Sequence, residues 1–236
     1  MNARAMRWVS LLAAALLGVG CVYRPRYETR DMRETRSVEA GEVESVRAQV
    51  EMGAGELRIH GGAGKLLEAD FDYNVPEWRP EVRYNRSLSR GYLTVRQPSS
   101  VFGIGQRRYQ WDLRFNNKTP LDLRVNLGAG QSDLHLAGLA LDGLEIHMGV
   151  GTLRLDLDGA WRKDFHARIH GGIGTAEVRL PREVGVRVSA HGGLGGIHTR
   201  NLRRSGGYYV NDAYGRSDVT LRIEISGGIG QIELIG

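Results

Sequence analysis

The second half of the chain alternates apolar and polar residues in strand-like runs, and glycine steps interrupt these runs at regular places. LEIHM precedes one step and TLRLDL follows it. Alternation with a period of two is typical of half-buried strands, and glycine allows sharp bends between them. Gly-x-Gly steps begin at Gly128, Gly149, Gly172, Gly193 and Gly228. Helical periodicity never extends beyond a turn or two, so the pattern predicts an essentially all-β fold.

The spacing of the steps indicates how the strands are arranged. The first four steps are 21, 23 and 21 residues apart, a repeat length typical of a β-solenoid whose coils stack in parallel. When the coils are aligned on their glycines, the inward columns are apolar with one exception, a threonine. They contain Val125, Ile146, Ile169, Ala190 and Ile225 before the step, then Leu134, Leu155, Val178, Thr199 and Leu234 after it. We therefore predict a single-stranded β-solenoid, a parallel β-helix-like stack of about 21 residues per coil, over residues 120–236.

Outward charged positions support the same alignment. One column reads Arg124, Glu145 and Arg168, and the other reads Asp133, Arg154 and Glu177, continued by His198 and later Glu233. Opposite charges on neighbouring strands stabilise a register by roughly 0.2–1 kcal/mol per pair. In this order of coils Ile169 lies between Ile146 and Ala190, and the C-terminal strand GQIELIG forms the open edge of the stack.

The N-terminus has the pattern of an export signal. Arg4 and Arg7 precede the apolar run WVSLLAAALLGVG, which leads to Cys21, the only cysteine. The run is shorter than the roughly 20 residues that a membrane span needs, so we interpret residues 1–20 as a secretory signal rather than a transmembrane anchor. The segment resembles a bacterial lipoprotein signal. This resemblance implies lipidation of Cys21 and anchoring to the cell envelope, at the periplasmic face of the outer membrane or at the cell surface.

Two further regions separate the signal from the solenoid. Residues 21–43 are rich in charge and lack apolar periodicity, so they are predicted to form a disordered tether. Residues 44–119 again alternate in strand-like runs, with Gly-x-Gly steps at Gly53 and Gly62. This pattern predicts an N-terminal β region built like the solenoid.

Two runs of this chain resemble a known family. EMGAGELRIHGGAGKLLEADFDYN and WDLRFNNKTPLDLRVNLGAGQSDLHLAGLALDGLEIHMGVG are similar to the bacterial toast-rack family, which is related to the C-terminal domains of LiaF-like cell-wall-antibiotic-response proteins. The resemblance covers roughly residues 44–236. It implies an envelope protein linked to stress sensing or membrane regulation.

Charge composition argues against a nucleic-acid partner. Lysine and arginine number 32 and aspartate and glutamate 27. Removing Arg4 and Arg7 with the signal leaves 30 against 27, which is nearly balanced and shows no basic block. With Cys21 used as an anchor, no thiol remains for a disulfide, so packing must stabilise the fold.

Histidines suggest a second candidate feature. His147, His170 and His191 each lie two residues before a glycine step, as does His60. Imidazoles stacked on neighbouring strands could supply two ligands to zinc or copper. The alternative is an outward polar ladder, and we favour it because no cysteine or carboxylate completes the column. We therefore expect no metal or other cofactor.

Enzyme signatures are weak throughout the sequence. The glycine steps do not continue into a phosphate-binding loop, and no serine lies in a nucleophile elbow. We therefore expect a non-enzymatic binding or scaffolding module of the envelope, with the stress-response role that the resemblance implies. Because parallel β-helices also host polysaccharide-cleaving enzymes, the alternative is a carbohydrate-active protein that binds or cleaves polysaccharide.

One segment is longer than a coil should be. Gly193 and Gly228 are 35 residues apart, which predicts an insert loop at about residues 200–218, and long insertions in solenoids are often binding sites. Arginine and tyrosine are common in protein interfaces, and this segment contains Arg200, Arg203, Arg204, Tyr208, Tyr209, Tyr214 and Arg216. We expect it to form, with the C-terminal end, the surface for another envelope protein or for self-association.

Overall fold

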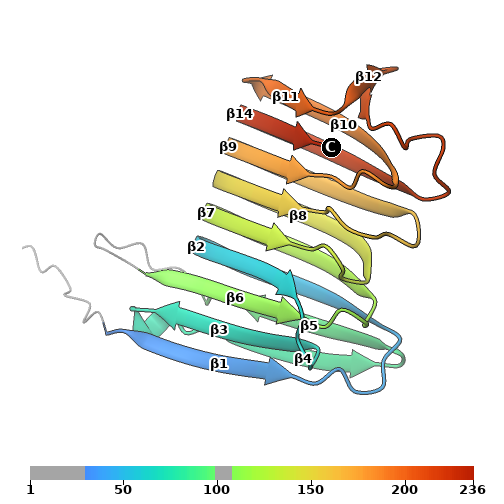
Figure 1. Ribbon diagram of the computed structural model, residues 1–236. Coiled ribbons are helices and arrows are strands. Elements are labelled where there is room, and N and C mark those ends of the chain that lie inside the picture. Colours follow the sequence, from blue (N-terminus) through green and yellow to red (C-terminus); the bar gives the residue numbers. More distant parts are fainter. Residues whose placement is uncertain (1–29, 99–107) are drawn as a thin grey trace, which may run out of the picture.

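The computed structural model describes residues 30–98 and 108–236. These residues form fourteen strands and one 3₁₀ turn, η1 (Pro76–Trp78), which confirms the predicted all-β fold (Figure 1). The strands are β1 (Met32–Val38), β2 (Ser45–Gly61), β3 (Leu67–Tyr73), β4 (Glu81–Ser87), β5 (Arg90–Arg96), β6 (Tyr109–Phe115), β7 (Leu121–His135), β8 (Leu141–Asp156), β9 (Phe165–Arg179), β10 (Gly185–Leu194), β11 (Ile197–Arg200), β12 (Arg203–Ser205), β13 (Tyr208–Val210) and β14 (Thr220–Ile235).

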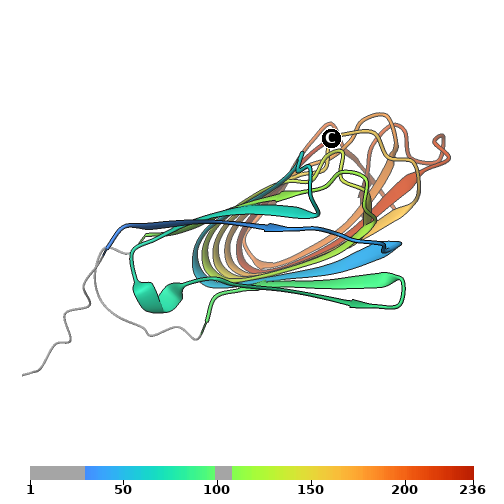
Figure 2. The ribbon, with the colours of Figure 1, turned by 90° about the horizontal axis from the view of Figure 1, so that it is seen from below.

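Each long strand bends back on itself at its Gly-x-Gly step, and the bends create two facing layers. β2, β7, β8, β9 and β14 each place one arm before the step in one layer and one arm after it in the other (Figure 2). Pairing is parallel on both sides of the bend, since Val125 is opposite Ile146 and Leu134 is opposite Leu155. The predicted stack of coils is therefore confirmed.

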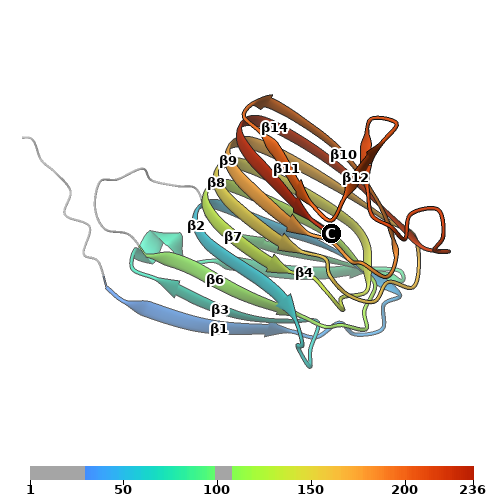
Figure 3. The same cartoon turned by 45° about the horizontal axis from the view of Figure 1, so that its top comes forward.

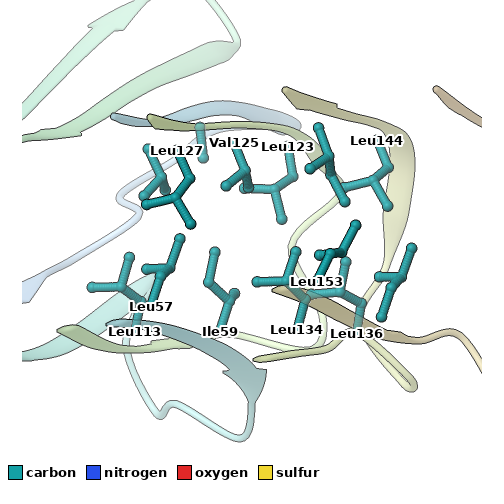
Figure 4. Packing of buried hydrophobic residues seen from close by; sticks show 14 of the residues in the cluster. Leu57, Ile59, Leu113, Leu123, Val125, Leu127, Leu134, Leu136, Leu144 and Leu153 are labelled. Atoms are coloured by element: carbon teal, nitrogen blue, oxygen red, sulfur yellow. The ribbon is translucent and has the colours of Figure 1, made fainter. Parts of the chain in front are cut away.

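The core lies between the two layers. Leu123 and Val125 on one layer face Leu134 and Leu136 on the other (Figure 4), and all four side chains are fully buried. These are the alternate positions that the sequence pattern assigned to the interior. Burial of apolar surface along the whole stack is the main source of stability for such an arrangement.

Close contact between coils explains the two glycines of each step. A β-carbon on Gly128 would lie 2.3 Å from the carbonyl oxygen of Gly53, and one on Gly130 would lie 1.9 Å from that of Gly55. Gly130 also has a φ of 134°, a conformation that residues with a β-carbon rarely adopt. The same approach recurs at each later step, so the bends stack only when both positions are glycine.

The order of the coils differs from the order of the chain at the C-terminal end. The strands follow the order β7-β8-β9-β14-β10, so β14 lies between β9 and β10. The predicted place of Ile169 between Ile146 and Ala190 is therefore wrong. Ile169 is opposite Ile146 on one side and Ile225 on the other. The expected open edge at GQIELIG is also wrong, because that segment is the second arm of β14.

Two contacts favour β14 beside β9. The carboxylate of Glu224 in β14 lies 3.5 Å from Nε of Arg168, whereas β10 carries the uncharged Ser189 at that height. The pairing also sets Leu234, a fully buried residue, against Val178. The stack thus places the more apolar coil in its interior and leaves the weaker coil at its end.

Because β14 lies between β9 and β10, the charged column that begins Asp133, Arg154 and Glu177 no longer alternates in sign. Glu177 is opposite Glu233, where the sequence pattern predicts His198 as the next neighbour. Each carboxylate instead has its own arginine: Arg179 Nε lies 3.1 Å from Glu177, and Arg200 pairs with Glu233. His198 follows on the far side of Glu233.

Further strands extend both layers at the N-terminal end of the stack. β5 and β4 continue the layer of first arms, and β6, β3 and β1 continue the layer of second arms.

β1 lies within the predicted tether, so the expected disorder is wrong for Met32–Val38. Cross-strand bonds hold this strand, because Thr35 Oγ1 donates to Asp70 at 2.6 Å and Arg33 Nε donates to Asp72 at 3.2 Å. Residues 1–29, including the predicted signal and Cys21, lie outside the described residues.

Candidate interaction surfaces

The insert forms a hairpin at the end of the stack. β12 and β13 pair antiparallel, and β13 pairs with the start of β10 through Arg187 opposite Val210 and Val188 opposite Tyr209. Figure 3 shows this hairpin beside β10 and β11 at the C-terminal end of the molecule. The insert therefore covers the first arm of β10 and leaves the second half of that strand uncovered.

Asn211 fixes the insert to the stack. Its side chain is 4% exposed and makes four hydrogen bonds. Oδ1 accepts from the backbone N–H groups of Val186 and Tyr214 at 3.0 and 3.1 Å, and Nδ2 donates to the carbonyls of Pro181 and Val184 at 3.0 and 2.8 Å. Sequence reasoning missed this residue, because nothing in the local pattern distinguishes a buried asparagine from one in a turn.

Four of the predicted interface residues lie together on the hairpin. The guanidinium of Arg187 stacks over the Tyr208 ring at 3.6 Å from its centroid, and that of Arg204 lies 6.0 Å from the Tyr209 ring centroid. Both tyrosines are half-buried, while Arg203 and Arg204 are exposed. Cations over aromatic faces hold such rings in place, so the hairpin presents two ordered tyrosines and two exposed arginines.

The other three predicted interface residues have contacts within the protein. Arg200 pairs with Glu233, and Nε of Arg216 donates to the carbonyl of Asp212 at 2.7 Å. Tyr214 lies in the turn whose backbone N–H is bound by Asn211. These residues shape the insert and are less available to a partner.

The C-terminal end of the chain lies against the insert, as the sequence suggested. Gly236 N–H donates to the carbonyl of Arg200 at 3.0 Å, and Asn201 Nδ2 donates to the carbonyl of Gly236 at 3.0 Å. Beside them is an open groove of about 610 Å³, lined by Arg182, Asn201, Leu202, Arg203, Asn211, Asp212 and Gly236. The predicted association of residues 200–218 with the chain end is thus present, although the terminal strand is internal.

The histidine column is interrupted. The rings of His147 and His170 stack with centroids 4.8 Å apart and an interplanar angle of 17°, but Ser226 follows His170, and His191 comes after Ser226. His147 Nε2 lies 2.7 Å from a Glu145 oxygen, and His170 Nδ1 lies 2.7 Å from Ser226 Oγ. Within residues 30–98 and 108–236, no group of three or more histidine, cysteine or acidic side chains converges on a metal-sized site.

A second exposed feature, which the sequence reasoning missed, follows the bends. The middle residues of the Gly-x-Gly steps point outward and stack in a row that we call the bend ridge. In spatial order it consists of Ala54, Ala129, Val150, Ile173, Ile229 and Leu194. The available signal in the sequence was the recurrence of a large apolar residue between two glycines, as GVG, GIG and GLG.

Comparisons with known proteins show the family and the fold of the chain. Residues 27–179 match the family model described as the N-terminal domain of toast_rack, DUF2154. A crystal structure from Clostridium sporogenes ATCC 15579, described as a "putative cell adhesion protein", has 28% sequence identity and a TM-score of 0.78, covering 87% of this chain and 99% of that chain. Another, a "putative adhesin" from Bacteroides fragilis NCTC 9343, has 9% identity and a TM-score of 0.31, covering 88% of this chain and 98% of that one. No curated protein matches the chain.

No helix among the described residues is long and apolar enough to cross a membrane.

Proposed function

Because its residues 27–179 match the N-terminal toast_rack domain, the chain belongs to the toast-rack family, and we propose that it is a non-enzymatic binding module at the cell surface. Support comes from the Clostridium sporogenes structure, which the chain covers almost completely and which is described in terms of cell adhesion. Rigid stacked coils that present a side-chain surface at one end suit binding rather than catalysis.

The β12–β13 hairpin is the binding surface that we propose. The observation that carries this proposal is the exposure of Arg203 and Arg204 beside tyrosines held in place by stacking and by the Asn211 bonds. Ordered aromatic rings and arginines give binding energy at low entropic cost. The partner in this proposal is another envelope protein or a second copy of the chain.

Crosslinking in intact cells tests this surface. Arg203→Glu with Arg204→Glu reverses two exposed charges without touching the buried Asn211, so the stack should remain folded while crosslinks to envelope partners are lost. Arg58→Glu with Arg90→Glu makes the same charge change at exposed positions of β2 and β5 and should leave the crosslinks unchanged. Equal crosslinking by the two variants would place the binding surface elsewhere.

We also propose that Cys21 carries a lipid anchor. An acyl chain contributes about 0.8 kcal/mol per buried CH₂, and stable anchoring takes more than one chain. The motivating pattern is the short apolar run that ends at the single cysteine. Cys21→Ser should abolish fatty-acid labelling and release the protein from the membrane fraction, whereas an unlabelled native protein would exclude the anchor.

The envelope-stress role is a narrower form of the same proposal. It rests on the relationship of this family to LiaF-like proteins. Deleting the gene should change the response of an envelope-stress reporter to a cell-wall antibiotic, and the charge-reversed hairpin should reproduce the deletion. An unchanged reporter in both strains would limit the function to binding or adhesion.

Polysaccharide cleavage finds less support in the geometry. A glycosidase of the usual kind needs a pair of carboxylates in a cleft, and the acids in the charged columns have basic partners. Arg154 Nη1 lies 3.1 Å from Asp133 Oδ1, and Arg124 Nη2 lies 2.6 Å from Glu145 Oε2. We therefore do not propose an enzymatic function, and polysaccharide remains a ligand to include in binding assays.

A further inference from the structure

The bend ridge carries most of the exposed large hydrophobic side chains of the described residues. Val150, Ile173 and Ile229 are each 50% exposed, and Leu194 is 70% exposed. They account for four of the six large hydrophobic side chains that are exposed in the described residues. Adjacent strands are about 4.8 Å apart, so these four side chains form an unbroken row of about 14 Å.

Packing does not require these side chains to be large. The inward residue just before each step is Met52, Leu127 and Met148 in the first three coils, but glycine in the coils of β9, β14 and β10. In the same three coils the outward residue changes from alanine or valine to isoleucine or leucine. The interior is left with an apolar hollow of about 40 Å³ at β9 and β14. In these coils the large apolar side chain therefore lies on the outside of the bend, although the interior beside it has unfilled space.

The ridge is flanked by uncharged residues. Five coils lack aspartate, glutamate, lysine and arginine from two residues before the first glycine to one residue after the second: residues 126–131, 147–152, 170–175, 191–196 and 226–231. Only the first coil has charges there, at Glu51 and Glu56. A surface that enters an apolar medium avoids the large cost of desolvating charges in this way.

The backbone at the ridge is suited to an apolar medium as well. Parallel pairing continues through the bends, with Ala129 opposite Val150 and Ile173 opposite Ile229. Backbone groups that enter lipid must be satisfied within the protein. Neighbouring coils pair with β7, β8, β9 and β14 on both sides, and with the second half of β10 on one side. The row also follows the convex outer side of the bends (Figure 2), a shape that a fluid surface accepts without a matching groove.

The chain enters the fold on the same side as the ridge. Met32 is opposite Tyr73, and Tyr73 is opposite Tyr109, whose carbonyl lies at the bend of β2 beside Gly55. Both the start of β1 and the bends lie along the left side of Figure 1. Arg30 follows Cys21 by nine residues, which reach at most about 30 Å. An anchor at Cys21 would therefore hold this side of the molecule close to a membrane.

We propose that the bend ridge inserts into the surface of a lipid bilayer, with Val150, Ile173, Ile229 and Leu194 among the upper acyl chains. The flanking histidines, threonines and glutamines then lie at the headgroups, and the edge of the stack rests on the membrane. The orientation rests on the envelope anchoring proposed above, whereas the apolar, charge-free ridge does not depend on it. The β12–β13 hairpin remains free to bind a partner.

A single fluorescent label tests the contact. Cys21 is the only cysteine, so the full chain with Cys21→Ser and Ile173→Cys can carry one environment-sensitive fluorophore. In vesicles of phosphatidylethanolamine and phosphatidylglycerol, its emission should shift to shorter wavelength and be strongly quenched by nitroxide-labelled lipid. The control is Leu88→Cys in the same background, an exposed apolar position in the turn between β4 and β5, and it should show neither effect.

A second variant tests the ridge as a unit. With the label at Val150→Cys, adding Ile173→Ser and Ile229→Ser should remove most of the lipid quenching, because the neighbouring side chains no longer enter the bilayer. Both serines replace exposed side chains, so circular dichroism should confirm an unchanged fold.

Three outcomes would overturn the proposal. The first is a chain that does not float with the vesicles, and the second is one that floats while the label at position 173 is quenched no more than the label at position 88. The third is a label that is shielded from aqueous iodide in the absence of lipid, with shielding that increases with protein concentration. That result would show that a second copy of the chain covers the ridge. Since this test omits Cys21, failure of the lipid anchor is measured separately by fatty-acid labelling.

Discussion

At the scale of single residues, neighbouring glycines in this stack serve different purposes. Gly171 points inward opposite Met148, and a β-carbon there would meet no atom within 4 Å. Gly172 is the first glycine of the step, and its β-carbon would lie 2.3 Å from the carbonyl oxygen of Gly149. The first is a place where a side chain is missing, and the second is a place where none fits.

This difference predicts opposite effects of the same substitution. Gly171→Ala should raise the free energy of unfolding by about 0.5–1 kcal/mol, because glycine costs about that much in a strand relative to alanine. Gly172→Ala should lower it by roughly 2 kcal/mol or more, because the coils must move apart. Urea denaturation of the two variants measures both values. Two equal changes would show that the inward and stacking positions are misassigned.

Asn211 is the residue on which the insert depends. Asn211→Ala removes four hydrogen bonds and leaves the buried Val186 N–H and two carbonyls without their partner, so the free energy of unfolding should fall by roughly 2–4 kcal/mol. Asn85→Ala, at an exposed position of β4, should change it little. Limited proteolysis should cut the insert of the first variant sooner than that of the second. Equal cleavage would mean that the β13 pairing alone holds the insert.

At the scale of elements, strand pairing determines the place of β14 in the stack. Arg168 is opposite Glu224, whereas a stack in chain order would set it opposite Ser189. In a Cys21→Ser background, Arg168→Cys with Glu224→Cys should therefore form a disulfide on mild oxidation, since partners on adjacent strands meet the distance that this bond needs. Arg168→Cys with Ser189→Cys should not. Electrophoresis without reductant distinguishes them, and the reverse result would restore the chain order.

β1 depends on a carboxylate and should respond to acid. The hydrogen bond from Arg79, aided by Arg36, lowers the pKa of Glu34 below its usual value. A lowered folded-state pKa means that the stabilisation is complete above the unfolded pKa and is lost as pH falls through the folded one. Amide protection in β1 should therefore decrease on acidification below the usual glutamate range, ahead of protection in β8. Glu34→Gln should remove this dependence, and an unchanged pH profile in that variant would assign the effect to other groups.

The elements differ in how far the sequence predicts them. The coils repeat a local pattern, and Val125, Ile146 and Leu134 could be assigned to the core because alternation and glycine spacing act within one coil. β1 was missed because its outward charges pair with residues far along the chain, such as Asp70 and Asp72. The bend ridge was missed because a middle residue between two glycines has no alternation from which to read its direction.

At the scale of the whole molecule, similar coils make the order of the stack hard to predict. Each coil presents a backbone edge of the same shape, so the sequence pattern alone accepts β10 or β14 beside β9. The choice depends on long-range pairs such as Arg168 with Glu224, and on an insert long enough to carry the chain past one coil and back. The candidate hairpin could be located from its length and composition, while its attachment through Asn211 required the three-dimensional structure.

The position of β14 has a consequence for how the chain matures. Synthesis and export deliver β10 to β13 before β14, yet β14 is a neighbour of both β9 and β10 in the finished stack. Until it arrives, β9 has an unpaired edge and the last coil has nothing to rest on, and exposed edges of this kind invite wrong pairing. β14 is therefore the last strand to enter the stack, and it completes the pairing of both of its neighbours. A chain that stops before residue 220 would leave the edges of β9 and β10 unpaired, and quality-control proteases could recognise these exposed edges.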